Sequence, residues 1–151
     1  MRMTATERGF APEAVEYLRD SFSKLANNSR IVNNLMVCGS MTQQQARRAL
    51  RWKTNPIVFF QPLSNHKCAN SVGDAKCAFN AANNCIEVNS DWLDAWDTTG
   101  GLLSTPSGLL VPNIGVAMLH ALCHWGNFKA KVKETAEMGF EFERMTYGTT
   151  F

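Results

Sequence analysis

Apolar residues recur at helical spacing in the first third of the chain. Within residues 12–36, the side chains that keep intervals of three and four residues are Ala14, Val15, Leu18, Phe22 and Leu25. Pro12 suits the first turn of this predicted helix, and the polar residues 27–29 predict an interruption in it. Thr42 is a suitable N-cap for a second helix with the sequence QQQARRALRW.

Two later segments have the composition of β-strands. Residues 55–63 (NPIVFFQPL) are β-branched and aromatic and are bounded by prolines. Residues 84–93 (NCIEVNSDWL) alternate apolar and polar positions, which predicts a half-exposed strand. Residues 64–84 and 97–112 are rich in turn-forming side chains and predict loops.

The C-terminal third predicts two more helices. Asn113 can cap the apolar segment IGVAMLHALCHWG, which we expect to end at Gly126. A charged connector, NFKAKVKET, leads to a last helix from about residue 136 to residue 147, with Gly148 just beyond its end. The summed pattern predicts an α+β fold, and the length suits a single domain over residues 1–151.

Composition excludes several classes of protein. Hydrophobic residues make up 45% of the chain and charged residues 19%, as in ordinary globular proteins. A net charge of +2 argues against a nucleic-acid-binding surface. No apolar run approaches the roughly 20 residues of a membrane-spanning helix. The first ten residues are too polar for a signal peptide, so export would need another route or a fused carrier domain.

The five cysteines leave two interpretations open. They are Cys38, Cys68, Cys77, Cys85 and Cys123. Their spacing does not match the paired CxxC motifs of a structural zinc site. They are either buried free thiols or form one or two disulfides in an oxidising compartment. Cys68 and Cys77 are the first pair to test, because the segment between them is short and rich in turn residues.

His120 and His124 are four residues apart on one face of a predicted helix, so both imidazoles can bind one metal ion. The rest of this helix is apolar, which leaves the two polar rings in need of an explanation. The alternative is that each ring bonds only to a backbone carbonyl. His66, in a predicted loop, is expected to be exposed.

The last predicted helix offers a carboxylate to the same ion. With Glu137 placed at zero on a helical wheel, Glu141 and Arg144 lie within about 40° and form a polar side. Glu143 lies at about 240° and is the carboxylate expected to point inward, where it needs a cation or a strong donor. Gly139 would let another helix approach. Two histidines and one carboxylate, with a fourth position left for water, are typical of catalytic zinc.

The motif carries a resemblance to a known class of enzyme. HALCH, followed by eighteen residues and Glu143, resembles the HExxH-x18-E arrangement of gluzincin metallopeptidases. LHALCHWGN…EMGFEFE resembles more closely the metallopeptidase toxin domains at the C-termini of bacterial polymorphic and type VI secretion effectors. The resemblance covers about residues 84–148, and the first 80 residues carry no recognisable motif. It implies a zincin-like fold, with an active-site helix and a glutamate helix packed on a small sheet.

The resemblance implies a role for each matching residue. His120 and His124 match the zinc-binding histidines. Glu143 matches the third ligand, and Glu137 is the alternative. Tyr147 is a candidate hydrogen-bond donor to an oxyanion, although a core aromatic at a helix end is the simpler interpretation.

Substrate binding has two candidates. Trp125 either lines the substrate cleft or simply packs in the core. The backbone of residues 84–93 is a candidate for pairing with an extended substrate.

Ala121 stands where this family has the glutamate that takes a proton from zinc-bound water. The three candidate ligands are present and only the base is missing. That pattern favours a deliberate Glu-to-Ala inactivation, with a natural pseudoenzyme as the alternative.

The resemblance also implies a biological setting. The active protein would be a zinc-dependent peptide-bond hydrolase and an antibacterial toxin, secreted or delivered into a target cell. Its partners would be a protein or peptide substrate, a cognate immunity protein, and a fused carrier or secretion-spike domain. Two other functions remain: a non-catalytic zinc-binding interaction domain, and a disulfide-stabilised secreted domain without metal.

Overall fold

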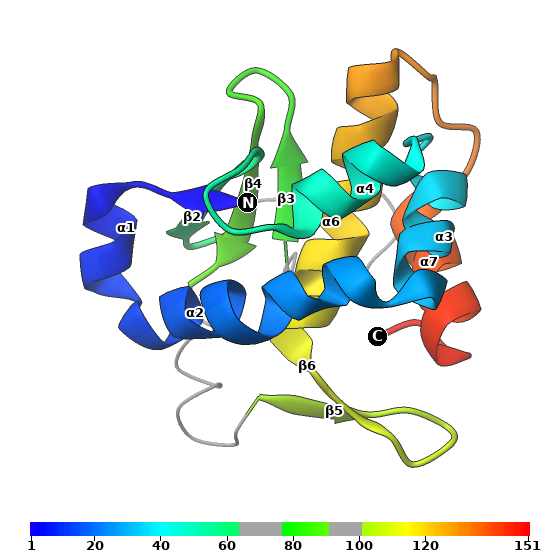
Figure 1. Ribbon diagram of the computed structural model, residues 1–151, viewed down its shortest axis with the longest axis horizontal. Coiled ribbons are helices and arrows are strands. Elements are labelled where there is room, and N and C mark those ends of the chain that lie inside the picture. Colours follow the sequence, from blue (N-terminus) through cyan, green and yellow to red (C-terminus); the bar gives the residue numbers. More distant parts are fainter. Residues whose placement is uncertain (64–76, 91–100) are drawn as a thin grey trace.

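A computed structural model describes residues 1–63, 77–90 and 101–151 (Figure 1). His66, Cys68 and most of the first predicted loop lie outside these residues. The helical elements are α1 (Ala5–Phe10), α2 (Pro12–Glu16), a π-helical turn (Tyr17–Ser21), a 3-10 helix (Phe22–Asn27), α3 (Ser29–Cys38), α4 (Gln43–Leu50), α6 (Asn113–Ala130) and α7 (Met138–Tyr147). The strands are β1 (Arg2–Met3), β2 (Ile57–Gln61), β3 (Cys77–Asn80), β4 (Cys85–Asn89), β5 (Leu102–Ser104) and β6 (Leu110–Pro112). The predicted α+β fold is confirmed.

The predicted helices before residue 50 are confirmed. The interruption at residues 27–29 is where Asn28 caps α3, and its side chain accepts a hydrogen bond from the Ile31 N–H at 3.2 Å. Thr42 caps α4 through a reciprocal pair of bonds. Its hydroxyl accepts from the Gln45 N–H at 3.2 Å, while the Gln45 side chain accepts from the Thr42 N–H at 2.8 Å. This capping box satisfies donors that a helix end leaves open.

The main sheet has the order β1-β2-β4-β3. β1 and β4 pair with β2 in parallel, and β3 pairs with β4 antiparallel. β4 is therefore a central strand, and all five of its residues are buried. The strand predicted within residues 84–93 is confirmed at 85–89, but its expected half-exposure is wrong, because both edges and both faces of β4 are covered.

Two segments predicted as loops contain short strands. β3 lies in the first, and the hairpin of β5 and β6 lies in the second, with Leu103 paired to Val111. Gly108 in the hairpin turn has φ +79°, a conformation that favours glycine. Strands of three or four residues give too little alternation to be distinguished from turn-rich sequence.

α6 is longer than expected and does not end at Gly126. A Cβ at this position would lie 2.2 Å from the carbonyl oxygen of Gly39, so the glycine lets the turn after α3 lie directly on the helix. The helix continues to Ala130 and ends where Lys131 adopts φ +57°. The first four residues of the predicted connector therefore belong to α6.

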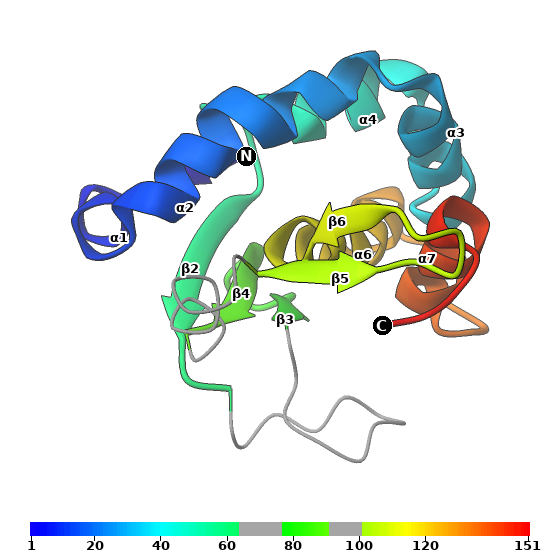
Figure 2. The same cartoon turned by 90° about the horizontal axis from the view of Figure 1, so that it is seen from below.

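α6 is the centre of the hydrophobic core. Met118, Leu122 and Cys123 have no exposed surface. β3 and β4 pack on one side of the helix, and α3 and α7 pack on another (Figures 1 and 2). Among the described helices, none combines the length and apolarity needed to cross a membrane. The two histidines thus lie on a helix that other elements cover on more than one side.

Candidate metal centre

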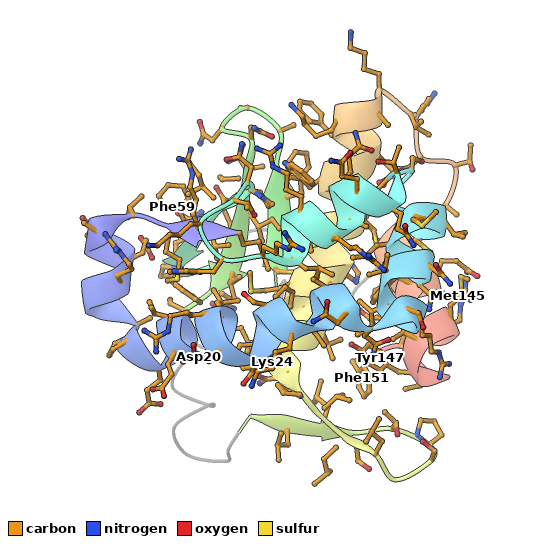
Figure 3. The ribbon with its side chains drawn as sticks, viewed as in Figure 1. Asp20, Lys24, Phe59, Met145, Tyr147 and Phe151 are labelled. Carbon is orange, nitrogen blue, oxygen red and sulfur yellow. The ribbon has the colours of Figure 1, made fainter. Side chains whose placement is uncertain are left out.

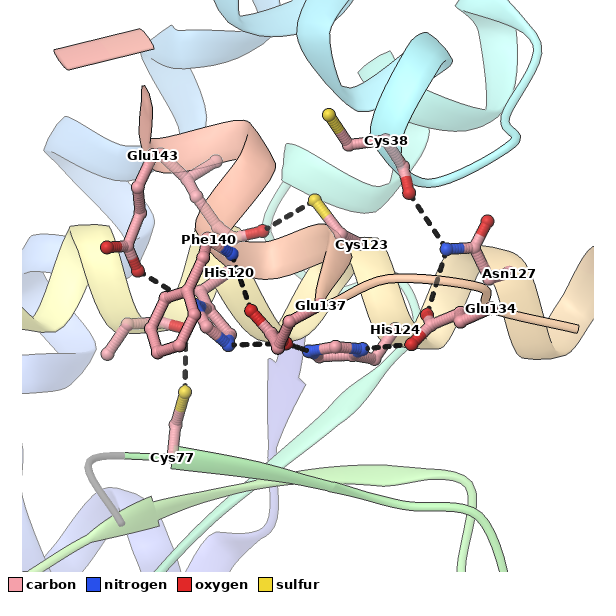
Figure 4. Close-up of polar contacts among 12 residues, drawn as sticks. Cys38, Cys77, His120, Cys123, His124, Asn127, Glu134, Glu137, Phe140 and Glu143 are labelled. Carbon is pink, nitrogen blue, oxygen red and sulfur yellow. Dashed lines mark hydrogen bonds and ion pairs between the residues drawn. The ribbon is translucent and has the colours of Figure 1, made fainter. Parts of the chain in front are cut away.

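The two histidines of α6 face the start of α7. Their ring centroids are 5.2 Å apart, and their side chains are 12% and 22% exposed for His120 and His124 respectively. The i, i+4 spacing brings both rings to one side of the helix. The Nε2 atoms of both rings point toward one carboxylate oxygen (Figure 4).

That oxygen belongs to Glu137, the N-cap of α7. Its Oε1 lies 3.3 Å from Nε2 of His120 and 2.5 Å from Nε2 of His124. Its Oε2 accepts a hydrogen bond from the Phe140 N–H at 2.6 Å. Ligand atoms of a tetrahedral zinc ion are about 3.3 Å apart for bonds of roughly 2.0–2.1 Å. These three atoms lie within 4.8 Å of one another, so they could hold a single small ion once the carboxylate moves back from its direct contact with His124.

The other nitrogen of each ring is held by a second carboxylate. Nδ1 of His120 lies 2.7 Å from Glu143 Oε1, and Nδ1 of His124 lies 2.8 Å from Glu134 Oε2. An ionised carboxylate only accepts, so each Nδ1 is the donor. In the neutral form of either ring, donation from Nδ1 would leave the lone pair on Nε2 for a metal ion, which is the arrangement of metal-binding histidines in proteins.

Glu143 points inward as predicted, but it contacts the far nitrogen of His120. The residue is 3% exposed, and its Oε2 accepts from the Phe151 N–H at 2.7 Å. The geometry thus favours the alternative, Glu137, as the third ligand. The helical wheel placed Glu137 on the polar side, but this residue has φ −77° and ψ 92°, so it lies outside the regular helix.

Gly139 lets α7 approach the histidines. A Cβ on this residue would lie 2.3 Å from both Cδ2 and Nε2 of His120. Any other side chain would occupy the space of the ring that offers its nitrogen to the metal. The expected role of Gly139 in close approach is confirmed.

The carboxylates around the two imidazole rings raise the pKa of both histidines. Burial lowers the pKa of His120, but hydrogen bonds and charge from Glu137 and Glu143 outweigh it and raise the pKa to about 9. Burial likewise opposes charge on His124, and Glu137 and Glu134 raise its pKa. Burial raises the pKa of Glu137, but the two histidines reverse this effect and lower it. Without a metal ion, the surrounding carboxylates therefore favour the protonated form of both rings.

The sequence also matches a known family. A family model described as metallopeptidase toxin 3 matches residues 11–148. The chain belongs to the metallopeptidase toxin 3 family. The match includes the N-terminal half, which carries no recognisable motif, and it confirms the resemblance to metallopeptidase toxins. No curated protein and no solved structure matches the chain.

In this metallopeptidase toxin, position 121 is enclosed. Ala121 has no exposed surface and belongs to the core. Phe128 lies seven residues further along α6, about 20° from Ala121 around the axis. Its ring contacts that of Phe79 on β3, with centroids 5.1 Å apart. Ala121 therefore lies on the face of α6 that is directed toward the sheet, next to the face that carries the two histidines.

Tyr147 and Trp125 of the toxin are partly buried and pack against the core. The Tyr147 ring contacts Phe142, with centroids 6.4 Å apart. It also contacts Phe151 near the C-terminus, with centroids 5.7 Å apart (Figure 3). Burial, followed by the charge of Glu143, raises the pKa of its hydroxyl. Trp125 donates its Nε1–H to Asn84 Oδ1 at 3.1 Å, in the turn between β3 and β4. These contacts favour the packing interpretation of both residues.

The cysteines give no support to a disulfide framework in the described part of the toxin. Cys38, Cys85 and Cys123 are buried free thiols. The Cys77 thiol donates to the Ala117 carbonyl oxygen at 2.9 Å. The proposed pair of Cys68 and Cys77 involves a residue outside the described ranges.

The sequence does not predict the contact between Glu134 and His124, because Glu134 is one of several charged residues in the connector before α7. Its carboxylate bonds to His124 and also to Asn127. An acidic residue ten positions after a histidine has no characteristic periodicity, so nothing in the sequence singled it out.

Proposed function

We propose that this chain is a zinc-dependent peptide-bond hydrolase domain of a bacterial toxin, with His120, His124 and Glu137 as the metal ligands. The observation that carries the proposal is the convergence of two Nε2 atoms and one carboxylate oxygen on one point. Two nitrogens and one oxygen suit zinc, with a fourth position for water. When bound, the ion would acidify that water and polarise a carbonyl group.

Each ligand is already oriented by a bond on its other side. Nδ1 of both histidines donates to a carboxylate, and Oε2 of Glu137 accepts from the backbone of Phe140. A ligand that is fixed in this way loses little conformational freedom when it binds an ion. The donor set is thus preorganised for binding.

Hydrolysis also needs a group that accepts the proton of the attacking water. Ala121 follows the first histidine, where a glutamate would supply that group, and a methyl group cannot accept a proton. We propose that the active toxin has glutamate at this position and that the present sequence is its inactivated form. A metal-binding pseudoenzyme is the second candidate, which the complete burial of Ala121 favours.

An extended substrate would pair with β3. The expected pairing of substrate with residues 84–93 is wrong for residues 85–89, because β4 already bonds to β2 and β3. Residues 91–93 of that segment lie outside the described residues. β3 is the terminal strand of the described sheet and packs against α6. At residues 78–80 the described strands pair with β3 only from the β4 side, so the other edge there could accept a further strand, as sheet edges do in peptide recognition.

The toxin family supports a substrate that is a protein or a peptide. We propose that the domain is delivered into a target bacterium by a fused carrier or secretion-spike domain. We also propose that the producing cell makes an immunity protein. These partners follow from the toxin role and not from particular residues of this chain.

The test compares the present chain with Ala121→Glu and Ala121→Gln. The glutamine variant has nearly the same shape but lacks the base. All three should bind about one zinc per chain, measured by elemental analysis after dialysis. Only the glutamate variant should cleave protein or cell-wall peptides and kill its expression host. A zinc-loaded glutamate variant that folds and remains inert would favour the pseudoenzyme.

A further inference from the structure

We propose that Glu134 and Asn127 act as a positioning pair for His124. In this pair, Glu134 fixes the imidazole ring and Asn127 fixes Glu134. The proposal rests on the metal site proposed above and extends it beyond the three ligands. Its consequence is that metal affinity depends on residues of the connector and of the last part of α6, neither of which touches the ion.

Glu134 lies in the connector between α6 and α7, where no regular backbone structure supports it. Its Oε2 is 2.8 Å from His124 Nδ1, and its side chain is 27% exposed. A long carboxylate on an irregular segment has several rotamers available, and each one lost on ordering costs free energy. Glu134 therefore needs a second contact if it is to hold the ring in one orientation.

Asn127 supplies that contact. It lies three residues after His124 on α6, so both residues share one side of the helix. Its Nδ2 group donates to Glu134 Oε1 at 2.9 Å and to the carbonyl oxygen of Cys38 at 2.8 Å (Figure 4). Asn127 is only 2% exposed. The amide thus has a fixed position, set by the end of α3, and passes that position to Glu134.

His120 is held differently, which makes the role of the pair specific to His124. Its partner Glu143 lies within α7, is 4% exposed on its side chain and has a backbone donor on its second oxygen. Regular helix and burial fix Glu143 without a further side chain. Loss of Asn127 should therefore disturb His124 through Glu134, and should not disturb His120.

The experiment measures zinc affinity on the chain as it stands, by competition with a chromophoric chelator at pH 7.5. Loss of the outer partner of a metal-binding histidine commonly weakens binding by about 10–100-fold. We expect a loss in this range for Glu134→Ala and a smaller one for Glu134→Gln, whose carbonyl can still accept from Nδ1. Glu16→Gln, which removes an exposed carboxylate on α2, is the matched control and should bind as the parent does.

A double-mutant cycle tests whether Asn127 acts through Glu134. Asn127→Ala should weaken zinc binding in the parent and cause no further loss in the Glu134→Ala background. If circular dichroism shows that Asn127→Ala is unfolded, Asn127→Asp is used in its place. Asn127→Asp removes the amide donor and places a negatively charged oxygen beside Glu134. Its affinity for zinc should therefore fall at least as far as that of Glu134→Ala.

A spectroscopic measurement separates positioning from general destabilisation. In the zinc-loaded parent, ¹⁵N NMR should show His124 protonated on Nδ1 with a sharp signal. In Glu134→Ala this signal should broaden or shift while that of His120 stays in place.

Two results would overturn this inference and leave the proposed metal site standing. In the first, the parent binds zinc and Glu134→Ala binds it with the same affinity. In the second, the losses of zinc affinity caused by the Asn127 and Glu134 substitutions are additive in the double variant. A parent that binds no zinc overturns the proposed metal site as well.

Discussion

Gly139 gives the ring of His120 the space it needs. Because a Cβ here would lie 2.3 Å from Nε2, Gly139→Ala must displace either the ring or the first turn of α7. We expect a loss of about 1–3 kcal/mol in the free energy of unfolding, the usual cost of overpacking. Zinc binding should weaken by at least tenfold. Urea denaturation and chelator competition measure the two effects.

Gly9→Ala is the control for that substitution. Gly9 is also helical, and a Cβ there meets nothing within 4 Å. Alanine should leave the stability unchanged or raise it by up to about 1 kcal/mol, because it favours helix. Equal destabilisation by both substitutions would contradict the steric argument.

The histidine network predicts how the stability of the metal-free protein changes with pH. The pKa of His120 is raised to about 9 in the folded state from an ordinary value of 6.5. The folded protein therefore binds more protons than the unfolded chain between these values, and its stability falls as pH rises. Burial lowers the pKa of the Met1 amino group from 8.0 to about 5, so this group contributes a change of stability in the opposite direction over the same range. The contribution of His120 is therefore measured as a difference between two proteins in EDTA. From pH 6.5 to pH 8, the free energy of unfolding from urea titrations should change less favourably in the parent than in His120→Gln, and equal slopes would contradict the raised pKa.

The sequence predicts single residues unequally. His120 and His124 could be predicted because both lie within one regular helix, where spacing determines direction. Glu143 could be placed inward for the same reason. Glu137 and Glu134 lie just before α7, where the backbone is not helical and a helical wheel assigns no direction. Their roles depend on how α7 packs on α6, which is a tertiary property.

At the scale of elements, three helices enclose two thiols. Cys38 ends α3 and Cys123 lies on α6, and neither has exposed surface. Burial, followed by the charge of Glu141, raises the pKa of Cys38 to about 11. Burial also raises the pKa of Cys123. Only the thiolate reacts with alkylating agents, so packing of α3, α6 and α7 protects both residues in two ways.

Iodoacetamide at pH 8 should therefore leave Cys38 and Cys123 unmodified in the folded protein. Both should react fully in 6 M urea, as seen by mass spectrometry of peptides. Rapid labelling of either residue under native conditions would show that the three helices separate readily.

Elements with strong local signals could be predicted, and short ones could not. α4 has a capping box and α2 begins with proline, so both are visible in the sequence. β3, β5 and β6 have three or four residues each and form only because a partner strand lies beside them. α6 passes through Gly126 because the turn after α3 requires close approach, which no local pattern reveals.

At the scale of the whole molecule, the proposed ion should raise the melting temperature. A ligand that binds only the folded state at 100 times its Kd adds about 2.7 kcal/mol. In a domain of this size each kcal/mol corresponds to roughly 2–4 °C, so the expected rise is about 5–11 °C. Calorimetry in zinc and in EDTA measures this difference. His124→Ala should abolish the rise, and a rise of equal size in that variant would place the ion elsewhere.

Glu137 has one further consequence as the residue at which α7 begins. Twelve residues separate it from His124, so an ion bound to both would close a short loop and join α6 to α7. Such a link acts as a cross-link and restricts the unfolded chain, as a disulfide does. In a domain whose buried Cys38, Cys85 and Cys123 form no disulfide, zinc would then be a reversible cross-link. The concentration of metal in the surrounding medium would control how readily this toxin unfolds and refolds.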